Sequence, residues 1–381
     1  MASLSYLYVL VSLLNPVSYL LYGHDRFNYK PAADDNEVQY KTLFVFGDSL
    51  YDPGNDQYLP NVTVEEYPAT TWPYGETFFH RPNGRLSDGR IVPDFIAKLA
   101  NLPMPPPYLQ PDPKNYTNGV SFASAGAGVL VETDPGTINL PLQLSYFKNV
   151  TELLQEQLGD EEAKKLLGSA VYLISMGGND YFTFYAEYQE NATEALQQEF
   201  IGIVIGNLTT VLQGIYDLGG RKIAFQNAGP LGCLPYAKQE YDTQLVVGCV
   251  EGLQSLARQH NKALASVLKE LESQLPGFKY SIFEYYDALG DRVLNPSKYV
   301  MLDKQYDGTD ACCGRGAYRG SDCGGLNGTV AYELCSNPGD SVWFDGSHTT
   351  ERANLQLAEL IWSGTPNVTW PYNVQQLFEQ E

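Results

Sequence analysis

Short apolar runs alternate with longer amphipathic patterns along this chain, and the alternation restricts the folds that it can adopt. Four runs rich in β-branched and aromatic residues have the composition of buried strands. They lie at residues 42–46, 171–175, 222–226 and 280–285. Helical periodicity follows at residues 151–167, 195–218, 250–275 and 350–362. Strands that alternate with helices predict an α/β fold with a central parallel sheet and right-handed crossovers.

The domain organisation predicted from this pattern is simple. No low-complexity linker or internal repeat divides the 381 residues, and the Pro-rich segment 102–113 lies between predicted elements. We therefore expect one domain over residues 24–381, with its core at about 40–364.

The first 22 residues contain no charged side chain and give way to a polar stretch that begins at His24. This pattern predicts a signal peptide at residues 1–23, although the usual Lys or Arg before the apolar region is absent. An uncleaved anchor and a buried helix are the alternatives. Asn15-Pro16 interrupts the stretch near its middle, which disfavours a membrane span.

Possible glycosylation sites and cysteines agree with export. Seven Asn-x-Ser/Thr sequons begin at Asn61, Asn115, Asn149, Asn191, Asn207, Asn327 and Asn367, so N-glycans are expected. We expect a secreted protein, extracellular or in the cell wall, with the vacuole as an alternative.

The six cysteines indicate disulfides in an oxidising compartment. Cys233 and Cys249 flank a polar loop and are expected to pair. The other four, at positions 312, 313, 323 and 335, predict a cross-linked loop whose pairing the sequence leaves open. A zinc site is the alternative, disfavoured because the chain has no Cys-x-x-Cys pair.

The charge balance excludes some partners. The chain has 45 Asp and Glu against 24 Lys and Arg, a net charge of −21. Such a chain repels phosphate backbones and anionic lipid surfaces, so we expect no nucleic-acid partner and no stable membrane insertion after the signal peptide is removed.

Histidine is scarce, which limits the choice of a catalytic base. The four are His24, His80, His260 and His348. His24 is near the expected cleavage site, His80 is in a polar loop, and His260 is on an amphipathic helix where a solvated position is expected. His348 follows Asp345 by three residues, and this carboxylate can orient the imidazole so that its other nitrogen accepts a proton. A helix-capping loop that merely contains Asp and His is the alternative.

A nucleophile and an oxyanion site are predicted where strands end. The run at 42–46 leads directly into Gly47-Asp48-Ser49, and the run at 171–175 into Gly177-Gly178-Asn179. In α/β folds, ligand chemistry lies at the carboxyl ends of parallel strands. Ser49 is therefore a candidate nucleophile, and the Asn179 amide a candidate donor to an oxyanion, helped by backbone N–H groups of the Gly-rich segment 124–128. Ordinary turn chemistry is the alternative for each.

In this order, the motifs resemble the GDSL esterase/lipase family, also called SGNH hydrolases, and most closely its plant branch. The matching blocks are FGDSLYDPGN (46–55), NGRLSDGR (83–90), GVSFASAGAG (119–128), GGNDY (177–181), GPLGCLP (229–235), ACCG (311–314) and the segment 345–350. Two positions depart from the family pattern: Thr349 replaces a common Pro, and Pro53 replaces a common Ala.

The resemblance implies a three-layer α/β/α sandwich and a catalytic set with no cofactor and no metal. Ser49 would be the nucleophile, His348 the base and Asp345 its partner. The oxyanion hole would comprise the Ser49 N–H, the Gly128 N–H (with Gly126 as the alternative) and the Asn179 amide.

The function expected from these residues is that of a secreted serine esterase or lipase. It would hydrolyse small-molecule or lipid esters through an acyl-enzyme. An acyltransferase with an alcohol acceptor and a non-catalytic secreted glycoprotein are the alternatives. The aromatic segment 181–185 either lines a substrate pocket or packs in the core, and packing is favoured.

Overall fold

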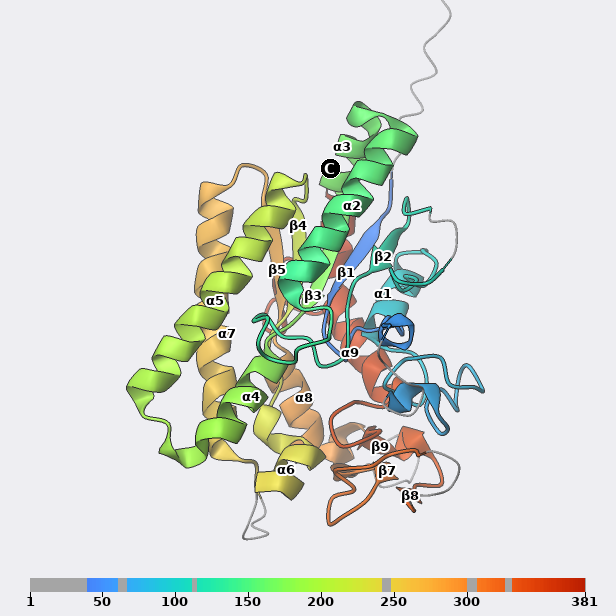
Figure 1. Ribbon diagram of the computed structural model, residues 1–381, viewed down its shortest axis with the longest axis vertical. Coiled ribbons are helices and arrows are strands. Elements are labelled where there is room, and N and C mark those ends of the chain that lie inside the picture. Colours follow the sequence, from blue (N-terminus) through green and yellow to red (C-terminus); the bar gives the residue numbers. More distant parts are fainter. Residues whose placement is uncertain are drawn as a thin grey trace, which may run out of the picture. The chain divides into compact units, whose positions relative to one another are not determined.

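A six-stranded sheet forms the centre of the computed structural model, with strand order β10-β5-β4-β3-β1-β2 (Figure 1). Its strands are β1 (Leu43–Gly47), β2 (Gly119–Ser121), β3 (Val171–Ser175), β4 (Lys222–Gln226), β5 (Lys279–Phe283) and β10 (Thr369–Pro371). The first five are parallel, and β10 pairs antiparallel with β5 at one edge. The four predicted strands correspond to β1, β3, β4 and β5.

The structure describes residues 40–60, 67–111, 115–241, 248–299, 307–325 and 331–380. They belong to one compact unit that starts at Tyr40. The predicted signal peptide and His24 lie outside the described residues.

Helices cover both faces of the sheet. One group contains α2 (Leu140–Leu158), α5 (Glu194–Asp217) and α7 (Glu251–Gln274), in which α5 contacts both of the others. The other contains α1 (Val92–Leu99), α8 (Tyr285–Leu294), α9 (Glu351–Ser363) and α10 (Val374–Glu379). In this group α1, α8 and α10 each contact α9. Figure 1 shows α2 and α5 in front of the strands and the red α9 behind them. The predicted three-layer sandwich is confirmed.

Shorter helices complete the layers. These are α3 (Asp160–Ser169), α4 (Gly178–Tyr188) and α6 (Pro235–Tyr241). The helix predicted at 151–167 is in fact two, α2 and α3, separated by Gly159 with φ of +82°. The aromatic segment 181–185 is part of α4, where Tyr181 is fully buried and Phe184 stacks on Phe200 at 4.5 Å. These contacts agree with packing.

An aromatic cluster fixes β1 against α2. Phe44 and Phe46, two residues apart on one face of β1, contact Phe147 of α2 with ring centroids 5.2 and 5.7 Å apart. All three rings are fully buried, and each buried Phe contributes about 1.5–3 kcal/mol. The cluster therefore holds the strand whose carboxyl end leads to Ser49.

All six cysteines form disulfides, so none is free to bind zinc. The predicted Cys233–Cys249 pair is confirmed, and the other pairs are Cys312–Cys335 and Cys313–Cys323. The last two cross-link a region with two small sheets, β6 (Asp307–Ala311) with β9 (Ser341–Trp343), and β7 (Cys313–Gly314) with β8 (Glu333–Leu334).

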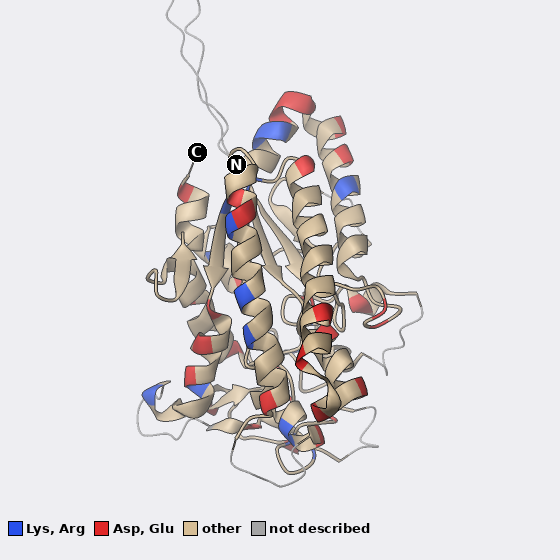
Figure 2. Cartoon of the chain, turned by 90° about the vertical axis from the view of Figure 1, so that its left-hand side faces the viewer, with Lys and Arg blue, Asp and Glu red and all other residues tan. Residues whose placement is uncertain are grey.

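Acidic and basic side chains are interspersed on the helices that Figure 2 shows. Within the described residues, α5 alone is long and apolar enough to cross a membrane, judged by length and composition. Seven of its apolar residues are buried, and it packs against α2 and α7.

Candidate active site

The Asp345–His348 pair lies in the loop between β9 and α9. Nδ1 of His348 is 2.7 Å from Oδ1 and 2.9 Å from Oδ2 of Asp345. The backbone N–H groups of Ser347 and His348 also donate to Oδ1, at 2.9 and 2.8 Å. Because an ionised carboxylate accepts hydrogen bonds and donates none, Nδ1 of His348 carries the proton. Nε2 is then the nitrogen that can accept a proton.

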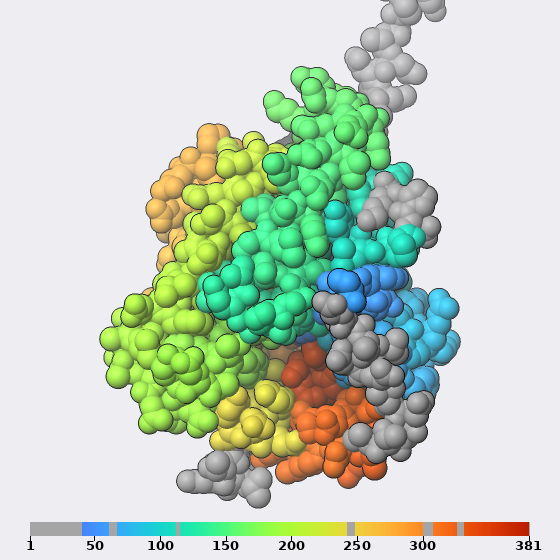
Figure 3. Space-filling view, in the orientation of Figure 1, coloured from blue at the N-terminus to red at the C-terminus, as the bar shows by residue number. Residues whose placement is uncertain are grey.

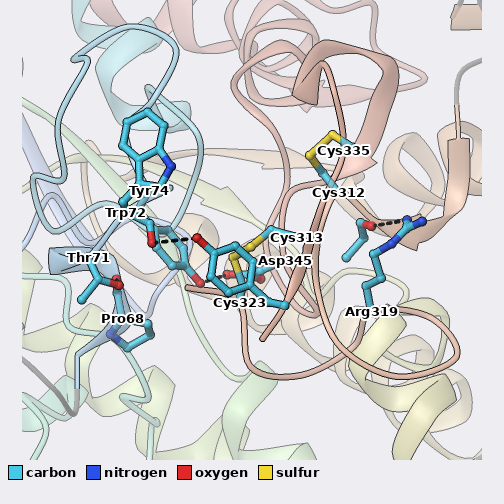
Figure 4. The surroundings of a disulfide bond; sticks show 12 residues. Pro68, Thr71, Trp72, Tyr74, Cys312, Cys313, Arg319, Cys323, Cys335 and Asp345 are labelled. Atoms are coloured by element: carbon cyan, nitrogen blue, oxygen red, sulfur yellow. Dashed lines mark hydrogen bonds between the residues drawn. A yellow bond between two sulfur atoms is a disulfide. The ribbon is translucent and has the colours of Figure 1, made fainter. Parts of the chain in front are cut away.

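Tyr74 is a further partner of Asp345 that the sequence analysis did not identify. Its hydroxyl donates to Oδ2 at 2.8 Å (Figure 4). Its buried ring packs edge-on against Phe344. Burial alone would raise the pKa of Asp345, but the adjacent His348 imidazole and the hydrogen bonds that the carboxylate accepts hold it below its ordinary value. The carboxylate therefore stays charged beside His348.

The loop also caps a helix. Thr350 is the N-cap of α9, with its side chain accepting from the Ala353 N–H, and its hydroxyl donates to Ser341 O at 2.8 Å. Thr349 is buried and donates to Asn354 Oδ1. Helix capping and the Asp–His pair are thus both present in this segment.

Ser49 lies in the turn that follows β1. Gly47 precedes it, and a Cβ there would be 2.7 Å from the Ser175 carbonyl oxygen of β3, so no side chain fits. The buried Gln143 of α2 accepts from the Gly47 N–H at 2.9 Å and donates to its carbonyl oxygen at 2.8 Å. The backbone before Ser49 is therefore fixed on both sides.

Asn179 lies in the first turn of α4. Its Nδ2 donates to Ala127 O at 2.9 Å, which leaves the second N–H of the amide for another acceptor. The neighbouring Asp180 accepts from the Val129 and Leu130 N–H groups and from the Thr133 hydroxyl. The two residues tie the glycine-rich loop to α4.

These segments meet at one cavity of about 670 Å³, here called the catalytic cavity. Its wall includes Ser49, Gly126, Asn179 and His348. Gly128 is buried and is not among the described residues of this wall; a Cβ there would be 2.4 Å from Thr133. In the space-filling view, a red segment is visible in a hollow between green, yellow and orange walls (Figure 3).

Comparison with known proteins gives the family. The model of the GDSL-like lipase/acylhydrolase family matches residues 43–361. The chain belongs to this family. It is 44% identical to GDSL esterase/lipase 1 of Arabidopsis thaliana, over 91% of this chain and 92% of that one. It is 43% identical to a GDSL lipase of Tanacetum cinerariifolium, over 92% and 91%.

Two other comparisons are more remote. The Arabidopsis protein named inactive GDSL esterase/lipase-like protein 25 is 37% identical, over 88% of this chain and 74% of that one. The crystal structure of a lipase from a goat rumen metagenome aligns over 84% and 94%, with 13% identity and a TM-score of 0.37, too remote to add to the assignment. The predicted membership of the plant branch and the class of carboxylic ester hydrolase are confirmed at the level of the family.

His260 corrects one expectation. The sequence favoured a solvated position on α7, but the ring is fully buried and its Nδ1 lies 2.7 Å from the Tyr181 hydroxyl of α4. Burial lowers the pKa of His260 to about 4. It supports the helix that carries Asn179 and does not line the catalytic cavity.

Buried carboxyl groups cluster near the site. Burial raises the pKa of Asp48 to about 7 and that of Asp88 to about 6. Burial likewise raises the pKa values of Asp52 and Asp56, and the neighbouring Asp52 charge adds to the effect on Asp56. Asp56 also lines the catalytic cavity. Burial therefore shifts all four carboxyl groups toward their protonated form.

Proposed function

We propose that this protein is a serine esterase or lipase that works through an acyl-enzyme on Ser49. One observation carries the proposal: Ser49, Asn179 and His348 line the same cavity, and Asp345 orients the imidazole through Nδ1. These are the groups that acyl transfer to a serine uses: a nucleophile, a base with an orienting carboxylate, and an oxyanion donor.

The reaction has two steps. Ser49 Oγ attacks the ester carbonyl carbon while His348 Nε2 takes its proton; that proton then goes to the leaving alcohol oxygen as the carbon–oxygen bond breaks. In the second step the water oxygen bonds to the acyl carbon while His348 takes a proton from the water. The acyl–Oγ bond then breaks, the acid is released, and His348 returns the proton to Ser49 Oγ. Asp345 stabilises the imidazolium in both steps.

The negative charge that develops on the carbonyl oxygen needs hydrogen-bond donors. We assign this role to the Ser49 N–H, to the free N–H of the Asn179 amide and to a backbone N–H of the glycine-rich loop. Gly126 is the better candidate for the last, since it lines the cavity and Gly128 does not. Removal of one such donor typically costs about 10²–10³ in kcat.

Export is proposed on independent grounds. We infer that residues 1–23 are a signal peptide and that residues 24–381 form one secreted domain, extracellular or in the cell wall, with the vacuole as an alternative destination. Three disulfides agree with an oxidising compartment. The five sequon asparagines within the described residues (Asn115, Asn149, Asn191, Asn207 and Asn367) are exposed and accessible to N-glycosylation.

The proposal is tested by Ser49→Ala. We expect this variant to keep the fold, because Ser49 is partly exposed and a hydroxyl is a small loss. It should lose turnover of p-nitrophenyl acetate down to the uncatalysed background. Circular dichroism of the variant checks the fold, and activity retained in a pure sample would overturn the assignment.

Acyl transfer is the main alternative outcome, since an alcohol can replace water as the second nucleophile. Product analysis with an added alcohol separates the two, because only transfer yields a new ester. A non-catalytic role is the other alternative, and the Arabidopsis relative at 37% identity is named inactive. For this chain that role is disfavoured because Ser49, Asp345, His348 and Asn179 are all present.

A further inference from the structure

A second cavity adjoins the catalytic cavity at His348. It measures about 430 Å³, and we call it the cystine-loop cavity because residues 320–325, which include the disulfide-bonded Cys323, line it. Four residues line both cavities: Pro68, Leu86, Ser347 and His348. Ser49 and Asn179 line the catalytic cavity but not the second one.

The chemistry of acylation decides which part of an ester faces each cavity. The oxyanion must face the Asn179 amide, and the leaving alcohol oxygen must lie beside His348 to receive its proton. The acyl part then lies in the catalytic cavity, and the alcohol part extends past His348. We propose that the cystine-loop cavity binds the alcohol part of the substrate, an uncharged alcohol or phenol. This inference rests on the function proposed above.

The wall of the cavity fits this class of ligand. Pro68, Tyr74 and Leu86 give it an apolar side, and a cavity of this size accommodates a small-molecule group. Its charged lining residues are Asp322 and Asp345, and the described lining includes no Lys or Arg. Asp322 is paired with Arg315 and Asp345 with His348, so the described lining offers no cation to pair with a phosphate or carboxylate on the alcohol.

Residues 320–325 lie in close contact with the loop that carries Asp345 and His348. A Cβ on Gly346 would be 2.0 Å from Gly320 O, so these two backbones touch. On the other side, a Cβ on Gly324 would be 2.9 Å from Thr71 Oγ1 and 3.2 Å from Trp72 O. Figure 4 shows the Cys313–Cys323 disulfide beside Tyr74 and Asp345. The cavity is thus preformed, which reduces the entropic cost of binding.

The same cavity would hold an acceptor alcohol in the second step. The acceptor O–H gives its proton to His348 Nε2, its oxygen forms a bond to the acyl carbon, and the acyl–Oγ bond of Ser49 breaks. His348 returns the proton to Oγ, so no other reactant is needed.

The proposal is tested by adding bulk to each cavity at a residue that lines that cavity and not the other. Ser321→Trp adds bulk to the cystine-loop cavity, and Thr137→Trp adds bulk to the catalytic cavity. The full secreted chain is assayed with two series of esters: acetates of ethanol and 2-naphthol, and p-nitrophenyl esters of acetate and octanoate. Ser321→Trp should lower kcat/KM for 2-naphthyl acetate at least tenfold relative to ethyl acetate and leave the acetate-to-octanoate ratio unchanged.

Matched variants remove the same hydroxyl without adding bulk. Ser321 Oγ accepts a hydrogen bond from Gln239 and donates one to Asp322, so Ser321→Ala isolates the loss of these bonds, and Thr137→Ala does the same for its bond to Asp134 O. Thr137→Trp should change the acyl preference and not the alcohol preference. If Ser321→Trp changed the acyl preference, or left the alcohol preference intact, the assignment of the cavity would be overturned.

A second measurement uses the unmodified enzyme, in case Ser321→Trp does not fold. With p-nitrophenyl acetate as donor, the acetyl group should pass to 2-phenylethanol more readily than to methanol at equal concentration. Equal transfer would contradict the alcohol site. If the wild-type chain turned over none of the esters, or if Ser49→Ala retained turnover, the proposed function itself would be contradicted instead.

Discussion

Four donors converge on the Asp345 carboxylate: the His348 ring, two backbone N–H groups and the Tyr74 hydroxyl. The residue is 6% exposed, so these groups take the place of water around its charge. Tyr74 does not touch the reacting atoms, and we regard it as a positioning residue for the base.

Tyr74→Phe should therefore lower kcat for p-nitrophenyl acetate roughly tenfold with little change in KM, the effect of one hydrogen bond to a charged group. Because the lost bond stabilised the ionised carboxylate, the pKa of Asp345 should rise and the acid limb of the rate profile should move to higher pH. Tyr172→Phe is the matched control, since its buried hydroxyl donates to Leu167 O, away from the site. An unchanged rate and acid limb in a folded Tyr74→Phe variant would contradict the positioning role.

Elements with strong patterns were predictable from the sequence, and short or polar ones were not. The buried runs of β3 and β4 were predicted to the residue. β2 and β10 have three residues each, too few for a periodic pattern, and they form through pairing with β1 and β5.

In the candidate site, too, only residues with a local signal in the sequence were predictable. Ser49, Asn179, Asp345 and His348 were marked by strand ends and local spacing. Gln143 was missed because the helix was expected to start at residue 151, which hid its place on the same face of α2 as Phe147, Val150 and Leu154. Tyr74 and the burial of His260 depend on contacts between distant segments, for which one sequence holds no local signal.

The packing of α4 against α7 gives a direct test of the corrected position of His260. His260→Ala should destabilise the fold by about 2–4 kcal/mol, because it opens a cavity beside Tyr181 and Gly177. Thermal or denaturant unfolding measures the loss. Lys262→Ala on the exposed face of the same helix should stay within about 0.5 kcal/mol. Equal, small effects of the two substitutions would indicate the solvated position that the sequence favoured.

At the scale of the whole molecule, the charge balance makes stability depend on pH. A net charge of −21 produces self-repulsion that weakens as acidic groups gain protons. The buried carboxyls act in the same direction. Because the pKa of Asp48 is about 7 in the folded chain and 3.8 is its ordinary value, the folded state binds the proton first, and stability rises as pH falls.

We therefore expect a higher melting temperature at pH 6 than at pH 8. Asp48 alone should contribute about 1 kcal/mol over this interval, or roughly 1–2 °C for a unit of this size. His260 has the opposite sign, since its folded pKa of about 4 lies below the ordinary 6.5, and its stabilising effect is lost as pH falls from 6.5 toward 4. Calorimetry across this range checks the expectation, with Asp48→Asn as the control that should show a smaller rise. A lower melting temperature at pH 6 than at pH 8 would contradict it.

The central claim is that Ser49 is the residue that becomes acylated. The most direct measurement is mass spectrometry after treatment with a p-nitrophenyl alkylphosphonate, in which a serine oxygen displaces p-nitrophenolate and keeps the phosphonyl group. We predict one adduct per chain, on the peptide that contains Ser49, and none in Ser49→Ala. An adduct on another residue, or an adduct that persists in Ser49→Ala, would contradict the account.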